Sequence, residues 1–133
     1  MSLVKGKKGL IMGVANERSI AWGISKKLAE NGAWIEYDMI GMDYYYADQK
    51  AQCPYDNENA FAIKNLIDNG FLNSILLSQD VFIKMMLKKY GGFGYTYILT
   101  HFKNRLLNVG VSEDQINEIL INNPRNVFSF DTI

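Results

Sequence analysis

The sequence predicts an α/β protein with a small, mostly parallel three-stranded sheet built from βαβαβ units, followed by extra C-terminal helices. Short apolar or β-prone runs recur at residues 10–12, 33–37 and 74–78. Segments with apolar residues at every third or fourth position separate these runs, which is typical of helices. Strands that alternate with helices form parallel sheets through crossover connections. Pairing between copies of the chain could complete so small a sheet.

Length, charge and cysteine content exclude several classes of protein. The 133 residues fit one domain, residues 1–133, and are too few for a whole (β/α)8 barrel or a whole dinucleotide-dependent reductase. Zero net charge argues against nucleic acid and membrane surfaces as partners. The single cysteine cannot form an intramolecular disulfide, and we find no signal peptide or long apolar span. We therefore expect a cytoplasmic protein.

The first βα unit is expected at residues 10–32. The strand at 10–12 is followed by a polar turn, and Ser19 is placed to cap a helix. Gly32 is a plausible C-cap of that helix. The apolar face of the helix is formed by Ile20, Ile24 and Leu28.

The second and third strands are expected at 33–37 and 74–78. Residues 38–56 between them form a long loop, and loops of that length are usually functional or loosely ordered. A helix capped by Asp56 or Asn57 should run to Asp68. The side chains expected to face inward are Phe61, Ile63, Leu66 and Ile67.

Three further helices are expected after the third strand. The first covers 81–89 and the second covers 96–108. Ser112 and Gln115 form a capping-box pattern that opens the third helix, which Asn123–Pro124 should break at residue 120 or 121. The inward face of the second helix is formed by Ile98, Leu99, Phe102, Leu106 and Leu107.

The segment 6–24 carries a specific pattern, GKKGLIMGVANERSIAWGI. Residues 3–33 resemble the N-terminal βα unit of bacterial NADH-dependent enoyl-acyl-carrier-protein reductases, in the short-chain dehydrogenase superfamily. In that family the turn and helix N-terminus bind the cofactor pyrophosphate, because their free N–H groups face anionic oxygens. The resemblance implies Gly13, Ser19 and Ile20 as residues that bind NAD. A tight turn alone is the simpler explanation of Gly13.

The catalytic tyrosine and lysine of that reductase family have no counterpart at the family's spacing. Tyr46 and Lys50 show the shorter spacing of other short-chain dehydrogenases, but they lie too early in the chain, and chance explains them. Asp38 follows the second strand, where dinucleotide folds place a ribose-binding carboxylate. A solvated strand-end carboxylate is the simpler interpretation of Asp38.

Residues 32–133 resemble a second family, the phosphotriesterase-like amidohydrolases. The run GAWIEYDMIG at 32–41 is similar to their seventh strand and loop, and ILLSQD at 75–80 is similar to their eighth strand. The runs at 88–95, 110–113 and 122–125 are similar to their C-terminal helical tail. That family attacks phosphoesters or lactones with a hydroxide that bridges two metals at the strand ends of a barrel.

The second resemblance implies Asp80 as a vestigial metal ligand, and a divalent metal such as zinc as a weak cofactor alternative. The family's other ligands are mostly histidines and a lysine, on strands that have no counterpart here. One aspartate cannot hold an ion that needs three or four protein ligands. A strand-end cap for the following helix is the simpler interpretation of Asp80. His101 lies in a predicted helix and is expected to have a structural or surface role.

Together the two resemblances predict an engineered or recombination-derived chimera, with a reductase-like unit at 1–33 and a phosphotriesterase-like segment at 34–133. We expect no catalytic residues, no bound cofactor and no evolved catalytic function, because neither active site is intact. Two alternatives stay open: weak binding of NAD(H) or phosphate through the Gly13–Ser19 turn, and a remnant metal-dependent phosphotriesterase- or lactonase-like hydrolase. Open sheet edges, and the tyrosines at 44–46 if exposed, predict self-association into a homo-oligomer.

Overall fold

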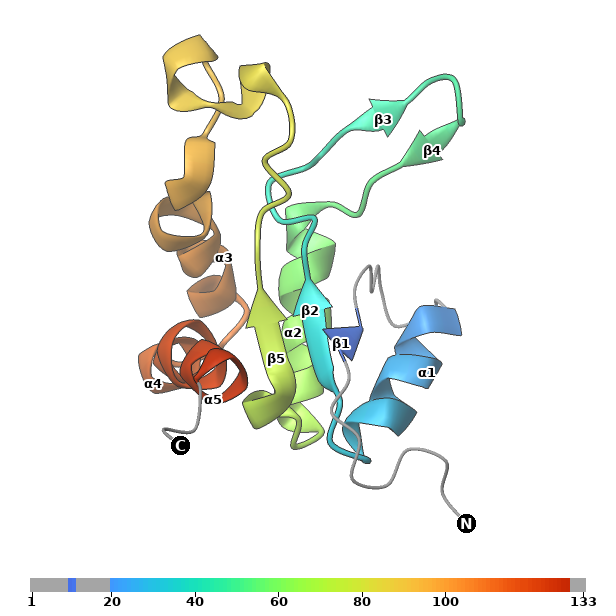
Figure 1. Ribbon diagram of the computed structural model, residues 1–133, viewed down its shortest axis with the longest axis vertical. Coiled ribbons are helices and arrows are strands. Elements are labelled where there is room, and N and C mark those ends of the chain that lie inside the picture. Colours follow the sequence, from blue (N-terminus) through green and yellow to red (C-terminus); the bar gives the residue numbers. More distant parts are fainter. Residues whose placement is uncertain (1–9, 12–19, 130–133) are drawn as a thin grey trace.

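Three parallel strands form the centre of the protein (Figure 1). The computed structural model describes residues 10–11 and 20–129. Strand β2 (Trp34–Tyr37) lies between β1 (Leu10–Ile11) and β5 (Ile75–Leu77), giving the order β1-β2-β5. Both pairings are parallel, with Ile35 opposite Ile75. The predicted strands and their parallel arrangement are therefore confirmed.

Helices connect and cover these strands. Helix α1 (Ile20–Ala29) joins β1 to β2, and α2 (Asp56–Asp68) lies in the connection from β2 to β5. Helical turns from 94 onward end in α3 (Lys103–Asn108). A second helical stretch contains α4 (Glu113–Asn117) and α5 (Asn123–Phe128). No helix in the described part of the chain is long and apolar enough to cross a membrane.

One apolar core lies between the sheet and the later helices. Alternation along β2 buries every second side chain, so Ile35 and Tyr37 point into this core. Helix α2 contributes one row of buried apolar side chains to the core, and the helices after β5 contribute a second row. Its largest apolar members outside β2 are Ile40, Ile63, Leu66, Ile75, Phe102, Leu106, Ile116 and Ile119, each at most 1% exposed.

Two predicted helix ends are confirmed in detail. Gly32 has a φ of +88°, and its N–H donates to the carbonyl of Ala29 over 2.9 Å, which ends α1. At the start of α4, the N–H of Gln115 donates to the Ser112 hydroxyl over 3.2 Å. The N–H of Ser112 donates back to the Gln115 side chain over 2.9 Å. This is the reciprocal capping box that the sequence predicted.

The helix predicted at 81–89 is wrong. The chain forms two short 3₁₀ turns there, Lys84–Met86 and Lys88–Tyr90. A Cβ at Gly92 would lie 2.3 Å from the backbone carbon of Met86, so the loop folds back on itself until the two backbones touch. Only glycine allows that approach, and a straight helix would separate these residues.

The break predicted at Asn123–Pro124 is also wrong. Backbone dihedrals stay helical through Asn122 and Asn123, and α5 continues to Phe128. A proline inside an α-helix clashes with the carbonyl four residues earlier and lacks an N–H. A wide π-type turn at Glu118–Asn122 precedes Pro124 and changes the hydrogen-bond spacing, so the helix tolerates the proline.

Three side chains expected to face inward are exposed instead. Ile24 on α1, Phe61 on α2 and Leu99 after β5 are 52%, 64% and 61% exposed. Their helices pack through a neighbouring stripe, which on α2 contains Ile63 and Leu66. Apolar periodicity indicates that a helix has an apolar face, but it does not fix which of two adjacent stripes meets the sheet.

The long loop after β2 contains a small hairpin that the sequence did not predict. Strands β3 (Tyr45–Tyr46) and β4 (Ala51–Gln52) pair in antiparallel fashion, and Figure 1 shows them projecting from the body. The turn has no glycine, and Lys50 takes a φ of +49° in its place. We call residues 43–55 the hairpin arm.

The C-terminal helix is tied to the start of β5 by one buried side chain. Asn123 is fully buried, and its Nδ2 donates to the carbonyls of Leu72 and Ile75, each over 2.8 Å. Hydrogen bonds toward β2 come from alternate β5 residues, as when the N–H of Ser78 donates to the carbonyl of Tyr37. The Ile75 carbonyl therefore points to the open edge of the sheet, and Asn123 covers it.

Candidate functional site

Two carboxylates lie beside each other where β2 and β5 end. The N–H of Asp80 donates to the carbonyl of Asp38 over 3.0 Å, so backbone pairing continues past both strands. The Asp80 residue is exposed, whereas Asp38 is half-buried. Within the described residues the Asp38 Oδ1 is buried without a hydrogen-bond partner. Because 81–89 is not an α-helix, the helix-cap role considered for Asp80 is wrong.

These two carboxylates do not by themselves fit a divalent metal. Zinc takes three or four protein ligands, mostly histidine, cysteine and carboxylate groups. In the ranges that the structure describes, no three such side chains gather where they could share an ion. The metal that the resemblance implies would need donors from elsewhere.

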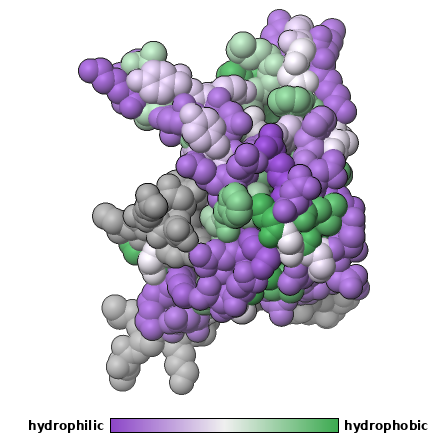
Figure 2. All heavy atoms as spheres, turned by 180° about the vertical axis from the view of Figure 1, so that it is seen from behind, coloured by the Kyte–Doolittle hydropathy of each residue, from purple (hydrophilic) through white to green (hydrophobic). Residues whose placement is uncertain are grey.

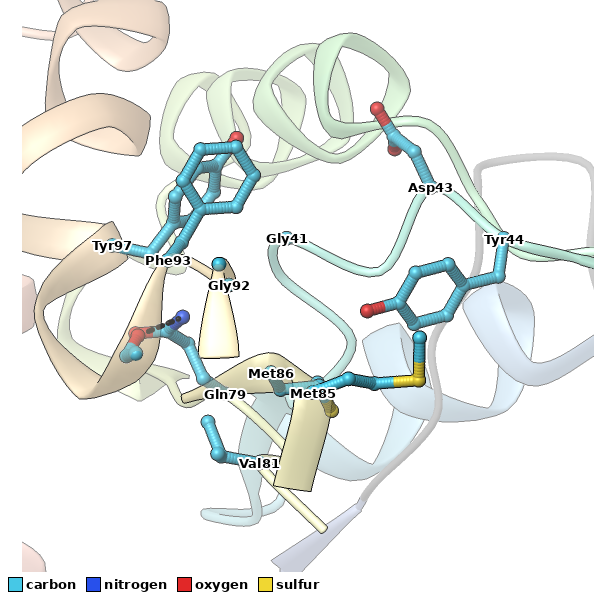
Figure 3. Close-up of a pocket in the computed structure, with 12 residues that line it drawn as sticks. Gly41, Asp43, Tyr44, Gln79, Val81, Met85, Met86, Gly92, Phe93 and Tyr97 are labelled. Carbon is cyan, nitrogen blue, oxygen red and sulfur yellow. Dashed lines mark hydrogen bonds between the residues drawn. The ribbon is translucent and has the colours of Figure 1, made fainter. Parts of the chain in front are cut away.

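A cavity of about 370 Å³ opens beside the two strand ends (Figure 3). The loop after β2 forms one wall with Gly41, Asp43 and Tyr44. The segment after β5 forms the rest, with Phe93 and Tyr97 opposite Tyr44 in the figure. Gln79, Val81, Met85, Met86, Gly91, Gly92 and Gly94 complete the lining.

The lining shows which side of β5 the cavity occupies. Gln79 and Val81 line it, whereas Asp80 between them does not. The Gln79 amide donates to the Gly94 carbonyl over 3.2 Å, which ties the strand end to the loop that closes the cavity. The cavity and the Asp80 carboxylate therefore lie on different sides of the same segment.

A buried carboxylate, Asp56, connects three segments below this cavity. Its Oδ1 accepts the N–H of Gly41 over 2.9 Å, and its Oδ2 accepts the hydroxyl of Tyr97 over 2.5 Å. Arg105 Nε lies 3.9 Å from the same Oδ2. The sequence suggested Asp56 or Asn57 as a helix cap. Asp56 is instead the first residue of α2, and Tyr55 occupies the cap position.

Tyr97 is held against the loop after β2. Gly41 has a φ of +82°, and a Cβ there would lie 2.9 Å from Cδ1 of Tyr97, so the ring packs directly on the glycine backbone. The sequence analysis identified neither contact. The only sequence signal was Gly41, four residues after the end of β2, and it did not indicate that Tyr97 would pack on it.

An aromatic stack extends from this tyrosine to the surface. The rings of Tyr97 and His101 are 5.2 Å apart and nearly parallel, and Phe93 lies 4.7 Å from Tyr97. The Thr100 hydroxyl donates to the Thr96 carbonyl, so the same oxygen accepts from Nδ1 of His101 over 2.8 Å. His101 is therefore exposed and helical, as the sequence suggested, and its stacking on Tyr97 is an additional finding.

Replacing Tyr97 by phenylalanine is expected to reduce the loss of stability at alkaline pH. Burial, and then the hydrogen bond to Asp56, raise the pKa of Tyr97 to about 12. A phenol with a higher pKa in the folded state stabilises the protein below its unfolded pKa of about 10. That contribution is lost as pH rises from about 10 to 12.

Urea unfolding at about pH 9 and pH 11 measures how much free energy of unfolding each protein loses between these pH values. Tyrosinate absorbance counts the phenols that ionise at high pH. Burial also raises the pKa of Tyr37, so its late ionisation should persist in both proteins and serves as the control. If the stability of variant and wild type depends on pH in the same way, the raised pKa assigned to Tyr97 in the folded protein is wrong.

The structure places only some of the remaining predicted residues. Gly13 and Ser19 fall outside the described residues, and Ile20 is the first residue of α1. Tyr46 belongs to β3 and pairs with Ala51, which places Lys50 in the turn of the arm. Burial, and then the neighbouring Cys53, Tyr44 and Asp80, raise the pKa of the Tyr46 phenol, so this tyrosine lies near the Asp80 carboxylate.

Comparison with known proteins gives a consistent result. A profile of the phosphotriesterase family matches residues 10–128. N-acetyltaurine hydrolase of Bos taurus is 34% identical over 106 residues, which are 78% of this chain. The chain spans only about 30% of the length of the curated relatives it matches.

Solved structures agree with the sequence matches. A resiniferatoxin-binding protein from Rhodobacter sphaeroides is 50% identical with a TM-score of 0.75, over 79% of this chain and 29% of that one. A phosphotriesterase homology protein from Escherichia coli, crystallised with phosphate in its active site, is 30% identical with a TM-score of 0.70. That match covers 86% of this chain and 39% of the other. Residues 10–33 lie inside the family match, and these comparisons do not support a reductase segment or a chimera.

Proposed function

The chain belongs to the phosphotriesterase family, and we propose that it is a remnant of a metal-dependent hydrolase of the phosphotriesterase or lactonase kind. This alternative is supported better than a chimera without function, because related proteins include hydrolases and the family match covers most of the chain. A reductase origin of residues 3–33 and NAD binding by the Gly13–Ser19 turn stay predictions.

One observation carries the proposal. Asp38 and Asp80 stand side by side at the carboxyl ends of two parallel strands, where α/β barrels place their active sites. Asp80 ends the run that resembles the eighth barrel strand, and it is exposed. We propose that it supplies a carboxylate to a site whose other ligands come from other strands of such a barrel.

The described residues limit what this chain can do alone. The bound metal of such a hydrolase activates water and polarises the substrate. Without a set of three donors, Asp80 can orient or accept a proton but cannot hold that metal. Hydrolysis therefore requires completion of the barrel.

A graft tests this proposal. Residues 32–128 replace the homologous segment of bovine N-acetyltaurine hydrolase, and hydrolysis of N-acetyltaurine is measured. We expect an active graft, in which Asp80→Asn lowers kcat/KM by about 10²–10⁴-fold, the range that a positioned proton-transfer group contributes.

Asp114→Asn is the matched control, because Asp114 is an exposed carboxylate in the first turn of α4. It should leave kcat/KM unchanged. A folded, active graft that tolerates Asp80→Asn as well as Asp114→Asn would exclude the assigned role.

A further inference from the structure

The cavity beside the strand ends is separate from the exposed carboxylate of Asp80. Gln79 and Val81 line it, whereas Asp80 between them does not. Its volume of about 370 Å³ lies within the range of small-molecule sites in proteins, about 300–1,000 Å³. Figure 2 shows from behind that the hairpin arm stands away from the body, so the arm does not fold over the segment after β5. The cavity can therefore receive a small molecule independently of the proposed hydrolase site.

Aromatic side chains lie on two walls of this cavity. Tyr44 belongs to the loop after β2, and Figure 3 shows Phe93 and Tyr97 opposite it. Tyr44 and Phe93 are 37% and 56% exposed, so both rings can contact a ligand. Met85 and Met86 add polarizable thioether groups to the lining. Aromatic rings on opposite walls are the arrangement by which proteins bind organic cations.

The charge of the lining is negative. Of the described residues that line the cavity, only Asp43 carries a charge. Its Oδ1 accepts the N–H of Asp56 over 3.0 Å, which fixes the carboxylate at the base of the hairpin arm. No hydrogen bond joins its other oxygen to a described residue. One carboxylate oxygen is therefore free to meet a ligand.

The lysines that follow β5 do not contribute to the lining. Lys84, Lys88 and Lys89 are exposed, and none of them lines the cavity. Nζ of Lys84 lies 4.8 Å from the centre of the Tyr90 ring, and Nζ of Lys89 lies 5.7 Å from it. Tyr90 is itself outside the lining. These two ammonium groups are therefore held on a ring outside the cavity, and they leave the charge of Asp43 unbalanced.

We propose that the cavity binds a small organic cation, an alkylammonium ion whose charged head lies between the rings of Tyr44 and Phe93. The negative faces of the rings attract the cation, and the free oxygen of Asp43 supplies the counter-charge. Met85 and Met86 contact its alkyl groups. An anionic ligand would meet Asp43 without a cation to balance it, and an uncharged ligand would gain nothing from the carboxylate.

The test measures binding of choline to the full chain by isothermal titration calorimetry. The matched probe is its uncharged analogue, in which a tert-butyl group of the same shape replaces the trimethylammonium head. We expect choline to bind at millimolar concentration and the analogue to bind about 5- to 30-fold more weakly, the range that cation–π contacts contribute. In NMR spectra choline should shift the methyl signals of Met85 and Met86, because both side chains line the cavity.

Two substitutions locate the site. Phe93→Leu keeps an apolar side chain without the ring, and Asp43→Asn keeps an oxygen for the N–H of Asp56 without the charge. Each should weaken choline binding by about 2- to 5-fold. The controls, Tyr95→Leu and Asp48→Asn, change an exposed ring and an exposed carboxylate outside the lining and should bind choline as the wild type does. Circular dichroism checks that each variant is folded.

Equal affinity of the wild-type chain for choline and for its uncharged analogue would overturn the proposal, because the charge would then play no part. So would the absence of choline binding at tens of millimolar, or choline binding that Phe93→Leu and Asp43→Asn leave unchanged. Tighter binding of pivalate, an anion of similar size, would also overturn it and identify the cavity as an anion site.

Discussion

Replacing Asp56 by alanine should lower the free energy of unfolding by about 3–5 kcal/mol, the cost of breaking a buried charge network by removing one partner. The Asp56 carboxylate is 1% exposed. Its loss leaves the N–H of Gly41 and the hydroxyl of Tyr97 without their acceptor. Both groups join the loop after β2 to other segments, so the cavity should open as stability falls. Urea unfolding followed by circular dichroism measures the change.

Asp56→Asn is the matched variant. The amide keeps an oxygen that can accept from Gly41 or Tyr97, so we expect a smaller loss than for alanine. Arg105 is about one-third exposed and can turn to solvent when the carboxylate is removed. A loss below about 1 kcal/mol for Asp56→Ala would show that the network does not hold the segments together.

Replacing Phe102 by alanine should cost about 3–5 kcal/mol, because a fully buried aromatic side chain leaves a cavity that neighbours fill only in part. Phe102 is 0% exposed and belongs to the core that β2, β5 and α2 share. The same unfolding experiment gives the change in free energy.

Leu99→Ala on the same helical stretch is the control. Leu99 is 61% exposed, so its truncation should change stability by less than about 0.5 kcal/mol. Sequence periodicity places both residues on the inward face, whereas the structure separates them. Equal losses for the two variants would favour the sequence-based assignment.

This pair of residues shows how far the sequence determines the fold. Ile98, Phe102 and Leu106 recur every four positions, and all three are buried as predicted. Leu99 lies one residue around the helical turn from Ile98 and is equally apolar. Only the position of the sheet decides between the two stripes, and a single helical segment contains no information about that position.

Predictions from residue type and periodicity were wrong where a specific backbone geometry decides the structure. The fold of residues 81–92 depends on the approach of Gly92 to Met86, which residue types in a window do not reveal. The helix continues through Pro124 because a wide π-type turn at Glu118–Asn122 comes directly before it. The hairpin arm has two-residue strands and no glycine turn, so the usual hairpin signal is missing.

The candidate site was predictable only in part. Residues 75–80 indicated a strand that ends at Asp80, and the strand and its family resemblance are supported. The links from Asp56 to Gly41 and Tyr97 span 15 and 41 residues. Nothing in the local pattern of Asp56 distinguishes a buried three-segment link from a helix cap, because aspartate is common in both positions.

The side chain of Asn123 has a consequence for synthesis of the chain. Its two acceptors, Leu72 and Ile75, lie 51 and 48 residues earlier, so β5 leaves the ribosome long before the group that covers its edge. At about 5–20 residues per second, the interval is on the order of 2–10 seconds. During that interval the edge of β5 is open to any other strand nearby, so slow translation of the last helix should increase aggregation on the polysome.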